Sequence, residues 1–466
     1  MQIYSEVPLF SSILQDSAEN NKQKFIASFI FQKIVYNGKQ ERMKTMINQM
    51  ELAPGVCLRA VQTDKFKTAC FSVNFLRQHT AQTAALDALL PSVLLRATEK
   101  YPDIRSISVH LDELYGATFG TLVRRKGEVK LLGFYADFIE DAFLPNNESV
   151  FAPMTEFLRE VLYHPLTENG VFCASCVAGE KQNLINAIEA NMNDKRSYAV
   201  TQMLQTMCAE EAYGVPRLGT AEEVRAITPE ALWAHYQTVL ATSRIEIFYS
   251  GRRTAQEAAE LFAPVFEGRE KTAFAPYGTQ VVRSAKRVRE CTETMDVTQG
   301  KLVMGLRTGI TVADPDYPAL LLLNTVLGAG MTSKLFVNVR EKLSLCYYAG
   351  SSIEKFKGVM VISSGIAFEN YETAKQAILH ELEDCKNGVI SEEELESARR
   401  QMRSALLAAM DAPAQMDEFY CGMAVCPGDD YPVLLEKIER LGVDDLRRAA
   451  EKLTLDTIYF LKGEQA

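Results

Sequence analysis

"EEVRAITPEALWAHYQTVLATSRIEIFYSG" (residues 222–251) contains two helical segments, a Thr-Pro turn between them and a β-strand that ends in glycine. Threonine is a common N-cap residue of helices, and proline is tolerated in the first helical turn. The same order returns near the C-terminus in "EKIERLGVDDLRRAAEKLTLDTIYFLKG" (436–463), where a Val-Asp turn separates the two helices. A helix–turn–helix–strand unit that occurs twice predicts a duplicated fold.

The segments upstream of this unit also occur twice. "ACFSVNFL" (69–76) precedes the apolar "TAALDALLPSVLL" (83–95), and "KLVMGLRTG" (301–309) precedes "YPALLLLNTVLG" (317–328). In both places an alternating, strand-like segment leads into a helix-like segment. The sequence therefore predicts an α+β fold that is built from two homologous halves.

The boundaries of the halves follow from these repeats. We place the first half at residues 47–265 and the second at 285–466, with a linker at 266–284 whose composition is polar and rich in small residues. Residues 1–46 are polar and lack a clear hydrophobic period. We treat them as an N-terminal extension, and we hypothesise that the start codon was assigned too early.

Long helices are expected at 167–192 and at 391–410. In the second of these, Ser391 is placed as the N-cap residue and Glu394 follows three residues later. A serine and a glutamate at this spacing can satisfy two backbone N–H groups at a helix start, which is typical of a capping box.

Composition and charge exclude several classes of protein. The chain has 466 residues and a net charge of -10, with no local basic stripe, so a nucleic-acid partner is not expected. No stretch approaches the roughly 20 apolar residues that cross a bilayer. The run at 22–35 has a basic start, but Lys33 interrupts it and no cleavage site follows, so we do not interpret it as a signal peptide.

The ten cysteines are scattered, and the pair in "CASC" (173–176) has no second pair nearby. This usage is typical of reduced thiols, so a cytoplasmic protein is expected. The segment "LGAGMTSKLF" (327–336) fails as a phosphate-binding loop, because its lysine follows a serine and precedes a leucine.

One stretch, "SISVHLDELYG" (106–116), contains half of a zinc-protease motif. His110 and Glu113 have the spacing of H-x-x-E, but Leu114 stands where the second histidine of H-x-x-E-H would be. Without further ligands this pattern is weak support for a metal. We interpret His110 and Glu113 as surface residues that flank the apolar pair Leu111 and Leu114.

Three stretches, the first of which includes 106–116, carry a resemblance to the M16 (insulinase/pitrilysin) metallopeptidases. They are 97–117, 212–236 and 327–352; the last is similar to the family pattern L-G-G-G-x-x-S-x-L-F-x-x-L-R-E-K-x-G-L-x-Y. The resemblance covers nearly everything after residue 47. It implies two tandem homologous domains of the LuxS/MPP-like metallohydrolase fold that form a clam shell.

The resemblance also implies where a zinc site would lie. The H-x-x-E-H positions fall on Ala88, Pro91 and Ser92. Alanine has no donor atom, proline cannot act as a general base, and a serine hydroxyl is a poor zinc ligand. The family's two later glutamates correspond to Glu180 and Ala187. We therefore predict no metal and no cofactor, and a chain that is catalytically inactive on its own.

A further family position concerns the grip on substrate. The asparagine that the family uses to hold the substrate backbone is replaced here by Phe119. The second half keeps the family's arginine and tyrosine as Arg340 and Tyr347. A guanidinium offers a planar donor fork for a carbonyl or carboxylate, and a phenol can donate to a developing oxyanion. Tyr348 is expected on the opposite side of the strand from Tyr347.

The resemblance finally implies a function, with alternatives. Bacterial members of the family often occur in pairs, so we expect the non-zinc subunit of a heterodimeric peptidase, with a zinc-bearing M16 homologue as partner and a peptide or protein as substrate. Arg340 and Tyr347 would act in trans or serve packing only. The resemblance alone suggests a role in the 5-aminopentanol modification of elongation factor P. The alternatives are a scaffolding or peptide-binding protein and a stand-alone metallopeptidase.

Overall fold

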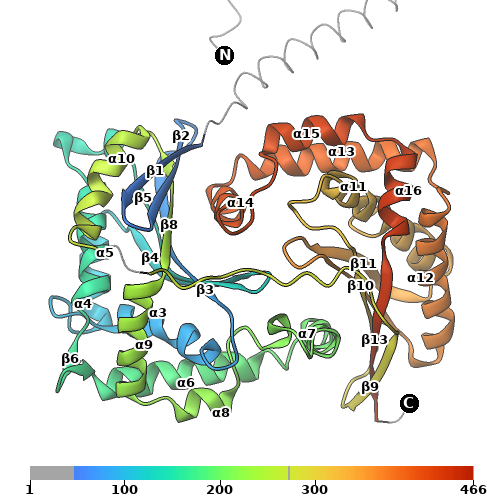
Figure 1. Cartoon of the computed structure of the whole chain (residues 1–466), viewed down its shortest axis with the longest axis horizontal. Helices are drawn as coiled ribbons and strands as arrows, with labels where there is room; N and C mark the ends of the chain where they lie inside the picture. Colours follow the sequence, from blue (N-terminus) through green and yellow to red (C-terminus); the bar gives the residue numbers. More distant parts are fainter. Residues whose placement is uncertain (1–46, 271–272, 465–466) are drawn as a thin grey trace, which may run out of the picture. The chain divides into compact units, whose positions relative to one another are not determined.

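The computed structural model describes residues 47–270 and 273–464 (Figure 1). The proposed N-terminal extension, including the apolar run at 22–35, lies outside the described residues. The described chain contains two α+β halves, as the repeats predict, and each half has one main β-sheet with helices packed on it.

The first half contributes most of its strands before residue 140. Its strands are β1 (Asn48–Ala53), β2 (Val56–Gln62), β3 (Thr68–Gln78), β4 (Thr118–Lys126), β5 (Val129–Ile139), the short pair β6 (Thr167–Glu168) and β7 (Val171–Phe172), and β8 (Arg244–Gly251). Its helices are α3 (Ala84–Arg96), α4 (Ile104–Glu113), α5 (Phe151–Tyr163), α6 (Ala174–Ala190), α7 (Lys195–Met207), α8 (Ala221–Ala226), α9 (Pro229–Thr242) and α10 (Ala255–Phe262).

The second half follows the same plan. Its strands are β9 (Arg289–Met295), β10 (Gly300–Arg307), β11 (Cys346–Glu354), β12 (Val359–Ile366) and β13 (Thr454–Gly463). Its helices are α11 (Tyr317–Leu327), a π-helix (Leu335–Lys342), α12 (Tyr371–Lys386), α13 (Glu392–Ala409), α14 (Pro413–Val425), α15 (Tyr431–Arg440) and α16 (Val443–Glu451). Short 3-10 helices occupy Asp141–Phe143, Pro145–Asn147, Ala212–Gly214, Ala263–Phe266 and Phe368–Asn370.

The two sheets have the same strand order when the second is read in reverse and β1 is left out. The first sheet runs β1-β2-β8-β3-β5-β4 and the second runs β11-β12-β10-β13-β9. In each sheet the strand that follows the helix pair lies between two earlier strands of its half. Strand β8 pairs with β2 in parallel and with β3 antiparallel, and β13 pairs with β9 in parallel and with β10 antiparallel. The repeated unit therefore reflects a duplicated topology, with β1 as an addition to the first sheet.

One helix of each half packs on the β-sheet of the other half (Figure 1). Helix α7 of the first half packs on β10 and β13, and its buried Met203 and Met207 join Val303 and Tyr459 in one apolar cluster. Helix α14 of the second half packs on β3 and β8. This second contact combines apolar and polar pairs: Phe248 stacks on Tyr420 at 6.0 Å between ring centroids, and Asp417 accepts a hydrogen bond from Ser72 at 2.5 Å.

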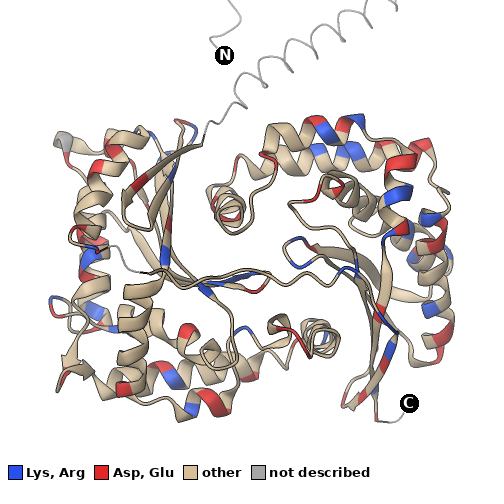
Figure 2. Ribbon diagram, in the orientation of Figure 1, with Lys and Arg blue, Asp and Glu red and all other residues tan. Residues whose placement is uncertain are grey.

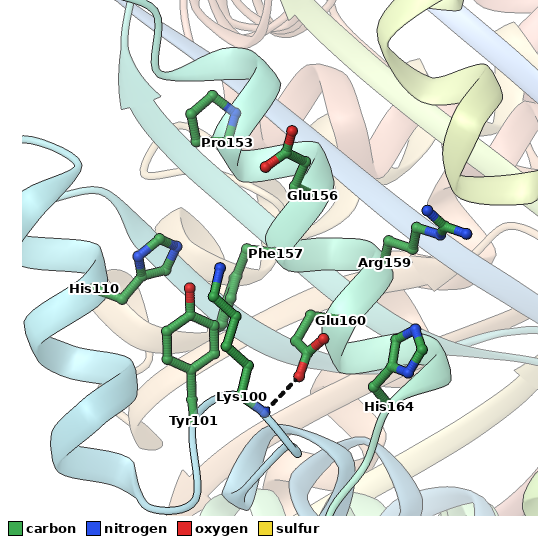
Figure 3. Close-up of a pocket in the computed structure, with 9 residues that line it drawn as sticks. All are labelled: Lys100, Tyr101, His110, Pro153, Glu156, Phe157, Arg159, Glu160 and His164. Carbon is green, nitrogen blue, oxygen red and sulfur yellow. Dashed lines mark hydrogen bonds between the residues drawn. The ribbon is translucent and has the colours of Figure 1, made fainter.

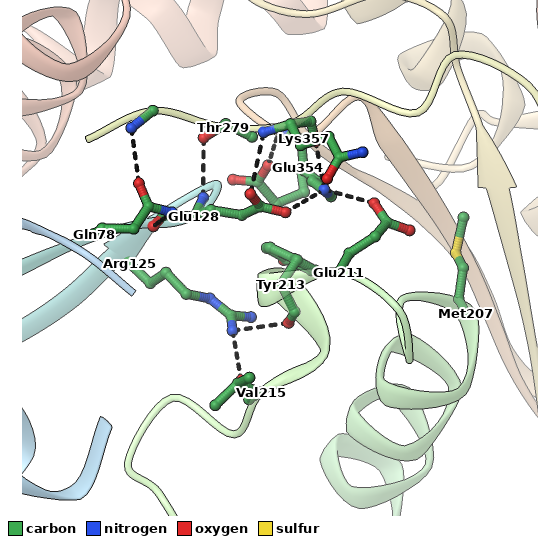
Figure 4. A network of polar contacts seen from close by, with 12 residues as sticks. Gln78, Arg125, Glu128, Met207, Glu211, Tyr213, Val215, Thr279, Glu354 and Lys357 are labelled. Atoms are coloured by element: carbon green, nitrogen blue, oxygen red, sulfur yellow. Dashed lines mark hydrogen bonds and ion pairs between the residues drawn. The ribbon is translucent and has the colours of Figure 1, made fainter. Parts of the chain in front are cut away.

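A buried ionic network also joins the halves (Figure 4). The ammonium of Lys357, in the second half, lies 2.5 Å from Glu128 and 2.6 Å from Glu211, both in the first half. It also donates to the backbone carbonyl of Gln280, which lies in the linker between the halves. Arg307 adds an ion pair with Glu211 at 2.6 Å. Opposite charges at these separations offset the cost of burying them, so the network fixes the connecting segment against both halves.

Two local predictions differ from the structure in detail. The helix expected from residue 167 begins only at Ala174, because 167–172 form a small hairpin whose turn residue Asn169 has a φ of 55°. The Val-Asp turn at 443–444 is already helical, and Gly442 caps that helix instead, with its N–H donating to Asp445. The capping box of Ser391 and Glu394 is present as expected.

Charged residues are distributed over the described surface without a single-sign stripe (Figure 2). Lys, Arg, Asp and Glu alternate along helices such as α13 and α15, where they form ion pairs such as Arg403–Glu439. Among the described residues, no helix has the length and apolar character that a membrane crossing requires.

Candidate functional site

Helix α3 occupies the place where the family resemblance puts a zinc site. Ala88 is 3% exposed and packs in the core of the first half. Pro91 is buried inside the helix, where its ring removes one backbone hydrogen bond. Ser92 is half-buried. These three side chains fill space and offer no strong metal donor, so this part of α3 is a packing surface.

The second place implied for a ligand lies on α6, which packs against α3. Glu180 forms an ion pair with Arg96 of α3 at 3.2 Å. Ala187 is exposed. Glu189 pairs instead with Arg225 of α8 at 2.9 Å. The two glutamates therefore link helices to one another, and in the described residues no three His, Cys, Asp or Glu side chains form a group that could hold a metal ion.

A buried polar group lies directly beside these positions. Asp87, fully buried on α3, is 2.8 Å from Nε2 of His235 on α9 and 3.3 Å from Nε of Arg77 on β3. The group ties the helix to two neighbouring elements. No local sequence pattern indicates this group, because His235 lies 148 positions after Asp87 in the chain.

Phe119 stands where the family has its substrate-binding asparagine. Its ring lies on β4 and contacts the rings of Phe134 at 5.5 Å and Phe157 at 4.9 Å between centroids. Because this side chain is buried in the aromatic core, it presents no polar group to a peptide backbone.

His110 and Glu113 of the half-motif lie apart from α3, on α4. The ring of His110 stacks on Tyr101 at 4.7 Å between centroids, and burial lowers its pKa. The two rings line a surface pocket of about 230 Å³ (Figure 3). Glu113 is exposed, whereas Leu111 and Leu114 pack against the core. The histidine is thus more buried than expected, since an aromatic neighbour covers one face of it.

The segment between α11 and β11 leaves regular helical geometry in two places. Leu335–Lys342 forms a π-helix, a rare conformation that is frequent at functional sites. Ser344 then has a φ of 51°, the left-handed region that favours glycine. Glycine is the residue that the family pattern has at this position. The backbone between Arg340 and β11 is therefore strained at Ser344.

The start of β11 contains a β-bulge. Cys346 pairs with Ile366 and Tyr348 pairs with Gly365, which leaves Tyr347 as the extra residue. A bulge changes the direction of side chains at the edge of a sheet. Here it leaves Tyr347 70% exposed, so its phenol is accessible from outside. The strict alternation expected from the sequence is interrupted at this residue.

Arg340 is held by its surroundings. Its Nε donates to the backbone carbonyl of Tyr347 at 3.0 Å, its Nη1 lies 3.1 Å from Glu341, and the guanidinium lies over the ring of Phe336. The structure thus brings the two predicted residues together through the backbone. Among the described residues, neither the Tyr347 phenol nor Nη2 of Arg340 forms a hydrogen bond or ion pair, so both are available to another group.

Known proteins resemble this chain in sequence. A family described as "Peptidase M16 inactive domain" matches residues 226–402. The chain is 33% identical to the probable inactive metalloprotease YmfF of Bacillus subtilis, over 88% of this chain and 96% of that protein.

Two solved structures are similar over most of their length. A conserved protein from Enterococcus faecalis has a TM-score of 0.82 and 30% identity, covering 90% of this chain and 99% of that one. The peptidase M16 inactive domain from Pseudomonas fluorescens has a TM-score of 0.73 at 18% identity, covering 90% and 98%. The second likeness concerns the fold alone.

Proposed function

The chain belongs to the M16 peptidase family as an inactive metalloprotease homologue, and we propose that it is the non-zinc subunit of a heterodimeric zinc peptidase. Its partner is a zinc-bearing M16 homologue, and its substrate is a peptide or protein held in a chamber between the halves of a clam shell. Arg340 and Tyr347 reach the partner's site in trans, so the chain itself needs no metal or cofactor.

The observation that carries the proposal is the exposure of Tyr347 on a bulge beside Arg340. A tyrosine kept only for packing would bury its ring, because burial of an aromatic side chain is what stabilises a core. An accessible phenol can donate to the oxyanion that develops when an amide is hydrolysed. The guanidinium next to it suits a peptide carbonyl or carboxylate.

The likeness to YmfF extends the proposal to a biological setting. We infer a zinc-bearing partner of the YmfH type, a cytoplasmic location, and a role in the 5-aminopentanol modification of elongation factor P. The scattered free cysteines support the location, since reduced thiols are typical of that compartment. The pathway rests on the resemblance alone.

The test is reconstitution with the zinc-bearing homologue. We expect the two chains to co-purify and to cleave a fluorogenic peptide. Tyr347→Phe and Arg340→Ala should each lower kcat/KM by about 100-fold, the usual effect of removing one oxyanion donor. Lys342→Ala is the matched control, because Lys342 is exposed on the same π-helix and its ammonium donates to Asn338 of that helix.

The outcomes separate the alternatives. Co-purification with an unchanged rate in both variants would leave a scaffolding or peptide-binding role and remove the action in trans. Failure to co-purify would remove the heterodimer. About one zinc per purified chain, measured by metal analysis, would support a stand-alone metallopeptidase instead.

A further inference from the structure

Three neighbouring strands of the second sheet place Tyr348, Gly365 and Lys301 side by side. Gly365 on β12 pairs with Tyr348 on β11 and with Lys301 on β10. Residues that pair directly across an antiparallel sheet project to the same face. The row is therefore a tyrosine and a lysine with a glycine between them, and the missing side chain leaves room for the Tyr348 ring.

Gly365 is required for this arrangement. A Cβ atom added to it would lie 2.5 Å from the ring of Tyr348 and 3.0 Å from the amide oxygen of Gln299. The first distance is shorter than real Cβ contacts allow and the second is unusually tight, so the Tyr348 ring leans over the glycine. Lys301 lies 5.9 Å from the centre of the same ring and donates to Gln299.

The row lies on the face of the sheet that α7 of the first half covers. Arg196, in the first turn of α7, places its guanidinium 4.1 Å from the centre of the Tyr348 ring. The two halves thus bring together two cations, Arg196 and Lys301, around one phenol. Within residues 47–270 and 273–464, neither cation lies within ion-pair distance of a carboxylate.

The hydroxyl of Tyr348 is buried and has no hydrogen-bond partner among the described residues. A buried polar atom without a partner costs stability and calls for an explanation such as a bound ligand. Burial raises the pKa of this phenol to about 12, so it carries its proton at neutral pH and can donate.

Among the described residues, the carboxylate whose charge acts on both Lys301 and Tyr348 already has hydrogen-bond partners. Asp194 caps α7, where its carboxylate accepts from the backbone N–H groups of Arg196 and Ser197 and from the Ser197 hydroxyl at 2.6 Å. Its charge acts on Lys301 and Tyr348, but its oxygens bond to α7. A further acceptor is therefore needed to satisfy the phenol.

We propose that Arg196, Lys301 and Tyr348 form a binding site for a carboxylate group of a peptide, assembled from both halves of the chain. The two cations supply charge, and the phenol donates a hydrogen bond to one carboxylate oxygen. The carboxylate comes from a peptide C-terminus or from an Asp or Glu side chain. The site does not depend on a zinc-bearing partner, since the isolated chain contains all three residues.

The test uses the acetylation of Lys301 as a local readout. Burial and the charge of Arg196 lower the pKa of this lysine, which makes its amine nucleophilic toward an N-hydroxysuccinimidyl ester. Modification is followed by mass mapping of the full chain, with Lys437, paired with Asp429 at 2.6 Å, as the internal control. The probes are N-acetyltriglycine and its C-terminal amide.

We expect N-acetyltriglycine at about 10 mM to slow acetylation of Lys301 about tenfold, as a dissociation constant of about 1 mM would give. The amide should leave the rate unchanged. In Tyr348→Phe, which removes only the hydroxyl, protection should fall to about twofold, because one charge-assisted bond is lost. Arg196→Gln should weaken protection similarly.

N-acetylglutamic acid α-amide, compared with N-acetylglutamine amide, distinguishes the two carboxylate sources. Protection by this probe alone assigns the site to acidic side chains, and protection by N-acetyltriglycine alone assigns it to a C-terminus. Equal effects of acid and amide, absence of protection by every acid, or full protection in Tyr348→Phe and Arg196→Gln would each overturn the proposal.

Discussion

Helix α3 of the first half and the 335–348 segment of the second half both stand at positions of family motifs, but α3 has lost its motif residues and the second segment has kept two of them. In α3 the motif places hold Ala88 and Pro91, which are buried in a regular helix. In the second segment Arg340 and Tyr347 stand on a π-helix and a bulge, with one strained residue between them.

The difference shows that side chains with a packing role and side chains with a chemical role are carried by different backbone geometry. Side chains that only fill space adapt to regular geometry, because regular helices satisfy their own hydrogen bonds. Irregular backbone costs free energy and persists where the surrounding structure maintains it, most often at functional sites. The first half therefore contributes stability, and the second half retains the features that we expect of a site.

The largest effect on stability is predicted for Ala88→His, which restores the first histidine of the H-x-x-E-H motif. Ala88→His would insert an imidazole into a core position that is 3% exposed, so we expect a loss of about 3 kcal/mol in stability, from overpacking and a buried polar ring. The single tryptophan, Trp233, packs on Phe172 in the same half, so its fluorescence during urea unfolding reports on this change.

Ser92→His is the matched control for this prediction. It inserts the same side chain one helical turn later, at a half-buried position, and should cost less than about 1 kcal/mol. If Ala88→His unfolded at the same urea concentration as the unchanged protein, α3 would have room for a ligand, and the packing interpretation would be wrong.

An intermediate effect on stability is predicted for substitutions of Ser344. Its φ of 51° costs a serine about 1–2 kcal/mol, part of which glycine avoids. Ser344→Gly should raise stability by about 0.5 kcal/mol, since glycine gives back some of the gain as unfolded-state entropy. Ser344→Val should lower it by about 1 kcal/mol, because a β-branched residue tolerates this conformation poorly. Thermal unfolding followed by circular dichroism measures both changes.

Ser108 provides the opposite case for comparison. It is exposed in the right-handed helix α4, so Ser108→Gly should destabilise by about 0.5 kcal/mol. Two serine-to-glycine changes with the same sign would show that the strain at Ser344 is absent in solution.

The sequence predicted features that depend on residues close together in the chain better than features that join distant residues. The helix–turn–helix–strand unit and the Ser391 capping box are local patterns, and both were predicted correctly. The start of α6 was wrong, because the residues before Ala174 turn into a hairpin that the helical period did not reveal. Contacts such as Asp87–His235 and Arg196–Tyr348 join residues that are more than 140 positions apart, which no local pattern indicates.

The bulge at Tyr347 explains why the strand alternation expected from the sequence is interrupted at this residue. Alternation along a strand assumes an unbroken register, and one extra residue changes the face of everything before it. The sequence "LCYYAG" (345–350) is compatible with a regular strand as well as with a bulge. The positions of Arg340 and Tyr347 were therefore predictable from the family pattern, whereas their presentation depended on pairing with β12.

The smallest effect is predicted for Tyr347 itself, and it separates function from packing. Tyr347→Ala should change stability by less than about 0.5 kcal/mol, because the ring is 70% exposed and loses little burial. Tyr348→Ala, one residue later, should cost about 2 kcal/mol, since that ring is half-buried under Arg196. Thermal unfolding of the two variants measures the contrast. Equal losses would mean that Tyr347 supports the fold as Tyr348 does, and its exposure would then no longer favour a role in trans.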